Sequence, residues 1–399
     1  MRIARFLLIP VVAASLLAGP AAEARPRTDP SPVLQTRAYA DDPAASPANA
    51  DADDPAIWVH PRRPEQSVVL GALKEGGLVA FDLHARQIAA IGVPEGGRFN
   101  NVDVVGNLAV VSDRGLDRIR VYRIDPAGSA AGAKVLTDVT DPLTPLVFSK
   151  SESEVEDQRT AYGLAAGTDR SGARIVAVTQ RHEARLALLK LVDKPGGKVG
   201  VEPLDTIGMP STFRLPNGKT WTPCGEPGEG PQFEGSVLDS KNQVLYSAQE
   251  DVGVWRIPLS RGGFGQPELI EKVRSFGAPA KFDAETEECL PDGPDPGFGG
   301  KWLTADAEGL TFIDGKLLAS SQGDSRFVYF GRTTRDFRVV AGHGTDSVEH
   351  SDGATVSQAY LGPRFPHGLL VVHDGERRPT IGDFATTGFA FVPLETVPR

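Results

Sequence analysis

Short apolar runs of strand length repeat along the chain, and each is followed by a small or polar turn and a second apolar run. The runs are rich in Val, Ile, Leu, Tyr and Phe, whereas the joins hold Gly, Asp, Ser or Glu, which is typical of β-hairpins. The pattern recurs six times, over residues 67–83, 108–124, 174–191, 243–259, 316–332 and 368–394, the last with a loop between its halves. Six hairpins of one design predict an all-β fold, a six-bladed β-propeller.

A shorter apolar segment precedes each hairpin and opens on an acidic, amide or tyrosine residue. The six openings carry Asp53, Asn100, Tyr162, Glu234, Glu308 and Asp352. The first strand of each propeller blade runs nearest the axis, so these residues are expected to ring one mouth of the central channel. Carboxylates that converge there repel one another unless they bind cations or shift their pKa values, and we expect bound metal.

The residue types indicate which metal. The openings offer carboxylate, amide and backbone oxygens, whereas the seven histidines are scattered and the two cysteines are far apart in sequence. A site of hard oxygen donors favours calcium, with magnesium or manganese as weaker alternatives, and disfavours zinc. We expect the histidines to be surface or loop residues; metal ligation is the alternative, for which His182 and His373, both at hairpin turns, are the two candidates.

The start of the chain has the features of a secretory signal peptide, residues 1–24, with arginines, an apolar run over 6–18 and small residues before the expected cleavage point. No other segment approaches the roughly twenty apolar residues of a membrane-spanning helix. Residues 25–50 are rich in Pro, Ala, Ser and Asp without periodicity and are expected to be flexible. Residues 51–399 are predicted to form one propeller domain of a secreted (extracellular) protein.

Charge and cysteine content refine this prediction. The formal net charge is −10, and loss of two arginines and one glutamate with the signal peptide makes it −11. Such a surface repels nucleic acid and other polyanions unless cations intervene, so we expect no nucleic-acid partner. We also expect no membrane partner and a monomer. Cys224 and Cys289 lie in segments rich in Pro, Gly and Glu. They suit an extracellular disulfide, with two free thiols as the alternative.

Motifs for several other chemistries are missing from the sequence. It contains no Gly-x-Ser-x-Gly elbow, no phosphate-binding Gly-x-x-x-x-Gly-Lys-Ser/Thr loop and no dinucleotide fingerprint. Beside the acids stand a few cations at hairpin turns, which could hold phosphate oxygens or be solvated turn residues. These cations are Lys74, Arg114, Arg118 and Arg181.

Seven short motifs carry a resemblance to a known family. They are Asp-Ala-Asp-Asp-Pro-Ala-Ile-Trp at 51–58, Asn-Asn-Val-Asp at 100–103, Phe-Glu-Gly at 233–235, Ala-Gln-Glu-Asp and a closing Trp at 248–255, Ala-Asp-Ala-Glu-Gly-Leu-Thr at 305–311, Ala-Ser-Ser-Gln-Gly at 319–323, and Leu-Gly-Pro-Arg-Phe-Pro-His-Gly at 361–368. In this order and spacing, from about Asp51 to the C-terminus, they resemble the β-propeller (alkaline) phytases.

The resemblance implies a six-bladed propeller that binds calcium and hydrolyses phytate (inositol hexakisphosphate), taken up as its calcium complex. It implies metal-assisted attack by water without a covalent intermediate. It implies catalytic roles for Glu234, Glu250, Tyr162, Asp306 and Glu308. It implies metal ligation by the same four carboxylates and by Asp53, Asp54, Asp346 and Asp352. Phosphate contacts would come from Lys74 and Arg114, with Arg181 as a further candidate.

The sequence also departs from the family pattern. Lys74 is followed by Glu75 instead of a second lysine, Gln180-Arg181-His182-Glu183 replaces a Gly-Lys-Glu-Gly segment, and the stretch after Asp374 lacks an Asn-containing run. Two insertions, 212–230 and 281–300, each hold one cysteine, and we expect a disulfide to join them beside the fourth and fifth inner strands.

Two other functions remain open. The first is another calcium-dependent propeller hydrolase, acting on lactones or phosphotriesters, which would not need cations beside the metal. The second is a non-catalytic, calcium-stabilised binding module, because a fold does not determine a function.

Overall fold

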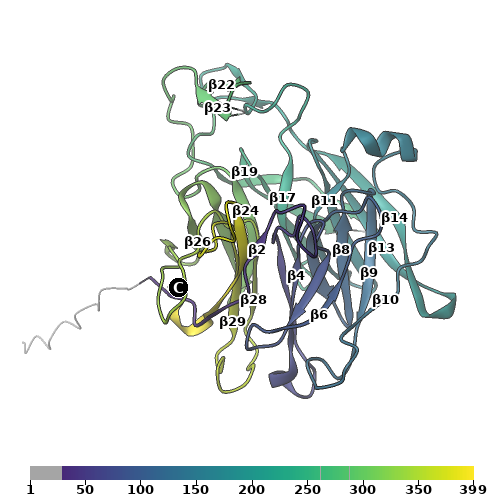
Figure 1. Ribbon diagram of the computed structural model, residues 1–399. Helices are drawn as coiled ribbons and strands as arrows, with labels where there is room; N and C mark the ends of the chain where they lie inside the picture. The colour runs from purple at the N-terminus through teal and green to yellow at the C-terminus, as the bar shows by residue number, and fades with distance from the viewer. Residues whose placement is uncertain (1–28, 261, 287) are drawn as a thin grey trace, which may run out of the picture.

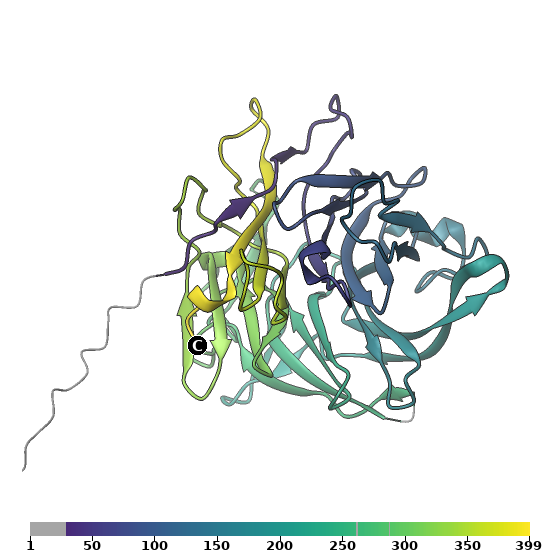
Figure 2. The same ribbon diagram turned by 90° about the horizontal axis from the view of Figure 1, so that it is seen from below.

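The computed structural model describes residues 29–260, 262–286 and 288–399, so the expected signal peptide lies outside the described residues. Within these ranges the strands form six larger antiparallel sheets and two small hairpins. The sheets are arranged around a common axis (Figures 1 and 2). The predicted six-bladed β-propeller is confirmed.

Each of the first five blades uses consecutive segments of the chain, with the first strand innermost. Blade one is β3 (Pro55–Trp58), β4 (Val68–Ala72), β5 (Leu78–Phe81) and β6 (Gln87–Ile91). Blade two is β7 (Phe99–Val105), β8 (Leu108–Asp113), β9 (Arg118–Ile124) and β10 (Leu136–Asp138). Blade three is β11 (Ala161–Thr168), β12 (Arg174–Gln180), β13 (Arg185–Lys194) and β14 (Lys198–Gly208).

The later blades follow the same order. Blade four is β17 (Phe233–Asp239), β18 (Val244–Gln249), β19 (Gly253–Ser260) and β21 (Glu268–Lys272), with β20 (Gly263–Phe264) also on β19. Blade five is β24 (Ala307–Ile313), β25 (Lys316–Ser321), β26 (Arg326–Phe330) and β27 (Thr334–Phe337). Short 3₁₀ helices span Pro64–Gln66, Glu152–Asp157, Pro195–Gly197, Gln322–Asp324 and Leu394–Thr396.

The sixth blade joins the two ends of the described chain. It consists of β28 (Ala354–Ser357), β29 (Leu369–Asp374) and β30 (Thr386–Pro393), and β30 pairs with β1 (Leu34–Gln35) and β2 (Tyr39–Ala40). Figure 2 shows the purple N-terminal segment beside the yellow C-terminal strand. The sequence predicted a flexible segment here, and the structure differs because edge strands of two residues leave no periodic pattern to detect.

Apolar side chains fill every interface between neighbouring blades. Six buried clusters correspond to the six interfaces, including the one that closes the circle between blades six and one. At this closing interface a Cβ added to Gly71 would lie 2.3 Å from the Phe389 ring, so glycine makes room for the aromatic side chain. Burial between blades therefore fixes the inner strands around the channel.

The two insertions form an arm outside the blades. It comprises the hairpin of β15 (Phe213–Arg214) and β16 (Thr220–Trp221) and the hairpin of β22 (Ala280–Asp283) and β23 (Glu288–Pro291). In Figure 1 the second hairpin stands at the top of the molecule, beyond the blades. The predicted disulfide between Cys224 and Cys289 is confirmed and joins the two parts of this arm.

Candidate active site

The inner strands of four blades begin with a β-bulge. In β7, β11, β17 and β24 the register with the next strand shifts between the first and fourth residues. A bulge re-aims side chains within a strand. The second residues of these strands, Asn100, Tyr162, Glu234 and Glu308, are all buried. The bulges thus present four of the predicted mouth residues in equivalent positions on successive blades.

Glycines directly after three of these residues let neighbouring inner strands approach closely. A Cβ added to Gly163 would lie 2.0 Å from the carbonyl oxygen of Glu234, and one added to Gly235 would lie 2.4 Å from that of Glu308. Gly309 makes a similar approach to blade six. No side chain fits at such distances, so these glycines set the spacing between the blades that carry the glutamates.

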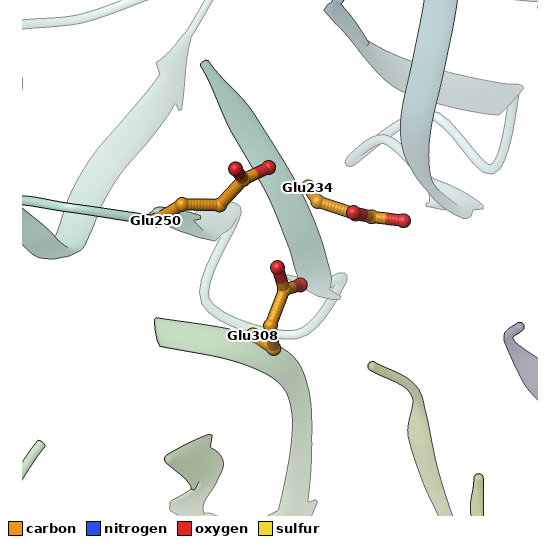
Figure 3. A group of neighbouring side chains, drawn as sticks. All are labelled: Glu234, Glu250 and Glu308. Carbon is orange, nitrogen blue, oxygen red and sulfur yellow. The ribbon is translucent and has the colours of Figure 1, made fainter. Parts of the chain in front are cut away.

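Three glutamates meet at the centre of the site, and we call them the glutamate triad (Figure 3). Glu234 lies in β17, Glu308 lies in β24, and Glu250 directly follows β18. One carboxylate oxygen from each lies within 4.8 Å of the others. Three like charges this close are strongly unfavourable unless a cation or protons compensate them.

Burial makes this repulsion more severe. It raises the pKa of Glu308 well above its usual range, and the charges of Glu234 and Glu250 raise it further. Burial also raises the pKa of Glu250 well above its usual range, with Asp306 as the next cause. Without a cation, protonation of these carboxyls is therefore favoured over three bare charges, and a bound cation would take the place of the protons.

Three aspartates extend the line of carboxylates around the channel to blade one. Burial and then Asp352 raise the pKa of Asp306 to about 6. Burial and then Asp53 raise the pKa of Asp352 to about 7, and burial and then Glu234 raise that of Asp53 to about 7. We call these three aspartates and the triad the mouth carboxylates.

Lys74 and Arg114 lie beside the mouth carboxylates. Lys74, in the turn between β4 and β5, places Nζ 3.5 Å from Asp53 Oδ2. Arg114, which follows β8, donates a hydrogen bond of 2.9 Å to Asn100, and its guanidinium carbon lies 5.6 Å from the centre of the Tyr162 ring. The site thus combines acidic groups with two cations of the kind that bind phosphate oxygens.

The other two candidate cations differ in their surroundings. Arg181, in the turn after β12, lies near Arg114: its backbone N–H donates to the Thr160 carbonyl at 2.9 Å, and the Thr160 hydroxyl donates to the Arg114 carbonyl at 2.6 Å. Burial and then the Arg114 charge lower the pKa of Arg181. Arg118 instead donates to the Thr144 carbonyl at 3.0 Å and pairs with Glu152. Arg181 therefore lies beside one predicted phosphate contact, and its own phosphate role stays a prediction, whereas Arg118 binds Thr144 and Glu152.

Asp54 and Asp346 occupy other positions. Asp54 faces the interior of the channel, where its Oδ2 accepts a hydrogen bond of 3.1 Å from the Val102 N–H. Asp54 and Asp103 both line a cavity of about 50 Å³ there. The Asp346 carboxylate accepts a hydrogen bond of 2.7 Å from the Arg378 N–H. Metal binding by these two aspartates stays a prediction, for sites separate from the triad.

The departures from the family pattern also have structural partners. Glu75 pairs with Arg98 and so does not stand alone in place of a lysine. His182 Nδ1 lies 2.9 Å from Oε1 of Glu229, which belongs to the arm. The arm thus contacts the same turn that carries Arg181.

Several buried oxygens at the mouth fit a divalent cation. Among the described residues, Glu250 Oε1, Glu308 Oε2 and Asp53 Oδ1 are buried and have no hydrogen-bond partner. Leaving such groups unpaired is costly, and carboxylate oxygens are the donors that calcium prefers. The mouth carboxylates therefore suit a hard, oxygen-seeking cation such as calcium.

Comparison with known proteins identifies the family. The model of the Phytase family matches residues 4–197 and 278–397, which together exceed half of the chain. The chain belongs to the Phytase family. The resemblance found in the sequence motifs is confirmed. The matched segments of this phytase-family chain include Asp53, Asp306, Glu308 and Asp352, and Glu234 and Glu250 lie between them.

Individual proteins are similar to this phytase-family chain over most of its length. It is 29% identical over 379 residues to the 3-phytase of Bacillus subtilis (strain 168), covering 90% of this chain and 83% of that protein. Among solved structures, a calcium-binding protein, regucalcin, from Agrobacterium tumefaciens is 12% identical with a TM-score of 0.44, covering 86% of this chain and 91% of that one. A gluconolactonase from Xanthomonas campestris is 13% identical with a TM-score of 0.41, covering 92% and 99%.

Sequence reasoning missed some polar residues of the site. Gln232 and Gln322 donate hydrogen bonds to mouth carboxylates, as does Asn100, which the sequence did predict at the mouth. Asp251 directly follows Glu250, and burial and then Asp306 raise its pKa to about 7. Gln232 directly precedes the Phe-Glu-Gly motif, and Gln322 lies in the Ala-Ser-Ser-Gln-Gly motif. Their positions in or beside these motifs are the sequence signal that could have identified them as site residues.

Proposed function

We propose that this protein is a calcium-dependent phosphomonoester hydrolase that releases phosphate from phytate. The observation that carries the proposal is the glutamate triad, with buried oxygens that lack partners, beside Lys74 and Arg114. Membership of the Phytase family and the similarity to a 3-phytase support the substrate.

The mouth carboxylates would hold calcium, which would supply positive charge for the phosphate oxygens and lower the pKa of a bound water. Lys74 and Arg114 would bind and orient phosphate oxygens from the other side of the site. The Tyr162 ring lies against the Arg114 guanidinium and supports its orientation. We propose direct attack of water on phosphorus, in line with the departing inositol oxygen and without a covalent intermediate.

A highly charged substrate must reach an acidic protein. Phytate that carries bound calcium is partly neutralised, so we propose that it binds as this complex. We propose that Arg181, near Arg114, contacts a second phosphate of the same molecule. A polyphosphorylated ring can use both contacts at once, which favours phytate over substrates with a single phosphate.

Secretion is part of the proposal. The predicted leader, residues 1–24, and the disulfide between Cys224 and Cys289 both suit an extracellular enzyme. Among the residues that the structure describes, no helix is long and apolar enough to cross a membrane. We propose a monomer that acts outside the cell.

A substrate panel tests the reaction class. The mature protein in calcium is assayed with phytate, a γ-lactone and an organophosphate triester, beside Lys74→Met and Arg114→Met variants. We expect phosphate release from phytate that falls at least tenfold in each variant. Turnover of the lactone or triester alone, unaffected by either variant, would contradict the proposal, and an absence of all turnover would indicate a binding protein.

A further inference from the structure

Amide side chains contact the mouth carboxylates on three blades. In each case an amide N–H donates to one carboxylate oxygen. The three hydrogen bonds run from Asn100 Nδ2 to Glu234 Oε1 at 2.5 Å, from Gln232 Nε2 to Glu250 Oε2 at 3.1 Å, and from Gln322 Nε2 to Asp352 Oδ1 at 2.5 Å.

The orientation of the Gln232 amide is fixed by a second contact. Its Oε1 accepts a hydrogen bond of 2.8 Å from the backbone N–H of His182, in the neighbouring blade. A backbone N–H can only donate, so the amide oxygen must face His182 and the NH₂ group must face Glu250. A backbone hydrogen bond of 3.2 Å from Glu250 N to the Gln232 carbonyl holds the two residues opposite each other.

Asn100 is oriented by the same logic. Its Oδ1 accepts a hydrogen bond of 2.9 Å from Arg114 Nη1, and a guanidinium can only donate. The Asn100 NH₂ group must therefore face Glu234. Asn100 and Gln232 thus each have the amide oxygen fixed by an obligatory donor and direct the NH₂ group at a carboxylate.

The consequence is clearest at Glu250. Oε2 receives the Gln232 N–H, whereas Oε1 is buried and has no hydrogen-bond partner among the described residues. One carboxylate oxygen is held and the other is left for a cation. Groups that hydrogen-bond to metal ligands orient them, and their loss typically weakens metal binding 10- to 100-fold.

We propose that Asn100, Gln232 and Gln322 are positioning residues: each holds one oxygen of Glu234, Glu250 or Asp352 and so orients that carboxylate for calcium binding. At Glu250 the second oxygen is left without a partner. This inference rests on the proposed function of the mouth carboxylates as a calcium site. It adds neutral hydrogen-bond donors to the proposed calcium site. It also predicts that calcium binding requires these amides as well as the carboxylates.

Calcium binding can be measured directly by isothermal titration of the mature protein after removal of bound metal. We define the mouth sites as the calcium-binding sites that the wild type has and Glu308→Gln lacks. Gln232→Met removes the donor at nearly the same size, and we expect calcium affinity at the mouth sites to fall at least tenfold. Gln322→Met removes the corresponding donor on another blade and is expected to have the same effect, so the test does not depend on the folding of one variant.

Gln358 provides a matched control. Its Oε1 accepts a hydrogen bond of 3.0 Å from the Asp314 N–H and its Nε2 donates to the Asp314 carboxylate at 2.6 Å, but at an exposed position. Gln358→Met should leave calcium affinity unchanged, and all three variants should unfold cooperatively in chelator. Affinity within twofold of the wild type in the folded glutamine variants would overturn this inference alone. Absence of calcium binding in the wild type would overturn it together with the proposed function.

Discussion

Arg114 lies over the ring of Tyr162, with its guanidinium carbon 5.6 Å from the ring centre. The same guanidinium donates to Asn100, so stacking and hydrogen bonding together fix its plane. A fixed guanidinium can present two parallel N–H groups to a phosphate, which an ammonium cannot do.

We therefore expect Arg114→Lys to lower kcat/KM for phytate about 10- to 100-fold. This corresponds to losing hydrogen bonds between charged groups worth about 1.5–3 kcal/mol. Arg118→Lys is the control, because Arg118 binds Thr144 and Glu152 instead. Steady-state kinetics at saturating calcium distinguish the two. Equal kinetics for Arg114→Lys and the wild type would remove Arg114 from the phosphate site.

The spacing between blades can be tested at Gly235. Gly235→Ala places a methyl group 2.4 Å from the Glu308 carbonyl oxygen, so the inner strands of blades four and five must separate. We expect a loss of about 1–3 kcal/mol in the free energy of unfolding, typical of overpacking, and weaker calcium binding. Gly208→Ala is the control, because a Cβ there meets no atom within 4 Å. Denaturant unfolding of both variants measures the difference, and equal losses would contradict the predicted constraint.

Proton binding at the mouth predicts a pH dependence of stability in chelator. In the folded, cation-free protein the pKa is about 7 for Asp53 and Asp352 and about 6 for Asp306, against an ordinary value of 3.8. The folded state then binds more protons than the unfolded state between about pH 4 and 7, so its free energy of unfolding falls as pH rises through this range.

Calcium should reverse this trend, because it replaces the protons and stabilises the folded state above pH 7. Urea unfolding at pH 5 and pH 8, in chelator and in calcium, measures both effects. Stability in chelator that rises from pH 5 to pH 8 would show that these carboxylates are not protonated in the cation-free protein.

The disulfide closes a long segment of chain. Cys224 and Cys289 are 65 residues apart in sequence, and a cross-link of this length is expected to stabilise the folded state by roughly 2–4 kcal/mol. Replacing both cysteines with serine should lower the free energy of unfolding by this amount, measured against the oxidised wild type. A reduced wild type should behave like the double variant, and unchanged stability in both would show that the arm unfolds separately from the blades.

The fold could be predicted from the sequence because each blade contains a hairpin with a clear apolar pattern. The hairpins over 67–83 and 108–124, for example, correspond to β4–β5 and β8–β9. The closure by β1 could not be predicted, because a strand of two residues is defined by pairing with Phe391 and Ala390 at the other end of the chain.

The site could be predicted in part for a related physical reason. Acidic residues at equivalent strand entries, such as Glu234 and Glu308, signal convergence on the axis. The amide of Gln232 carries no such signal, because its role depends on His182 in the next blade and on Glu250 across the hairpin. Likewise, pairing of Glu75 with Arg98 depends on contact between blades one and two.

The central claim is that calcium at the glutamate triad drives phosphate release from phytate. The most direct measurement is phosphate release by the mature protein in calcium and in chelator, with Glu308→Gln beside Glu202→Gln, an exposed glutamate of β14 paired with Lys194. We predict release in calcium by the wild type and Glu202→Gln, and loss of at least 100-fold in chelator and in Glu308→Gln. Full activity in chelator, or in Glu308→Gln, would contradict the claim.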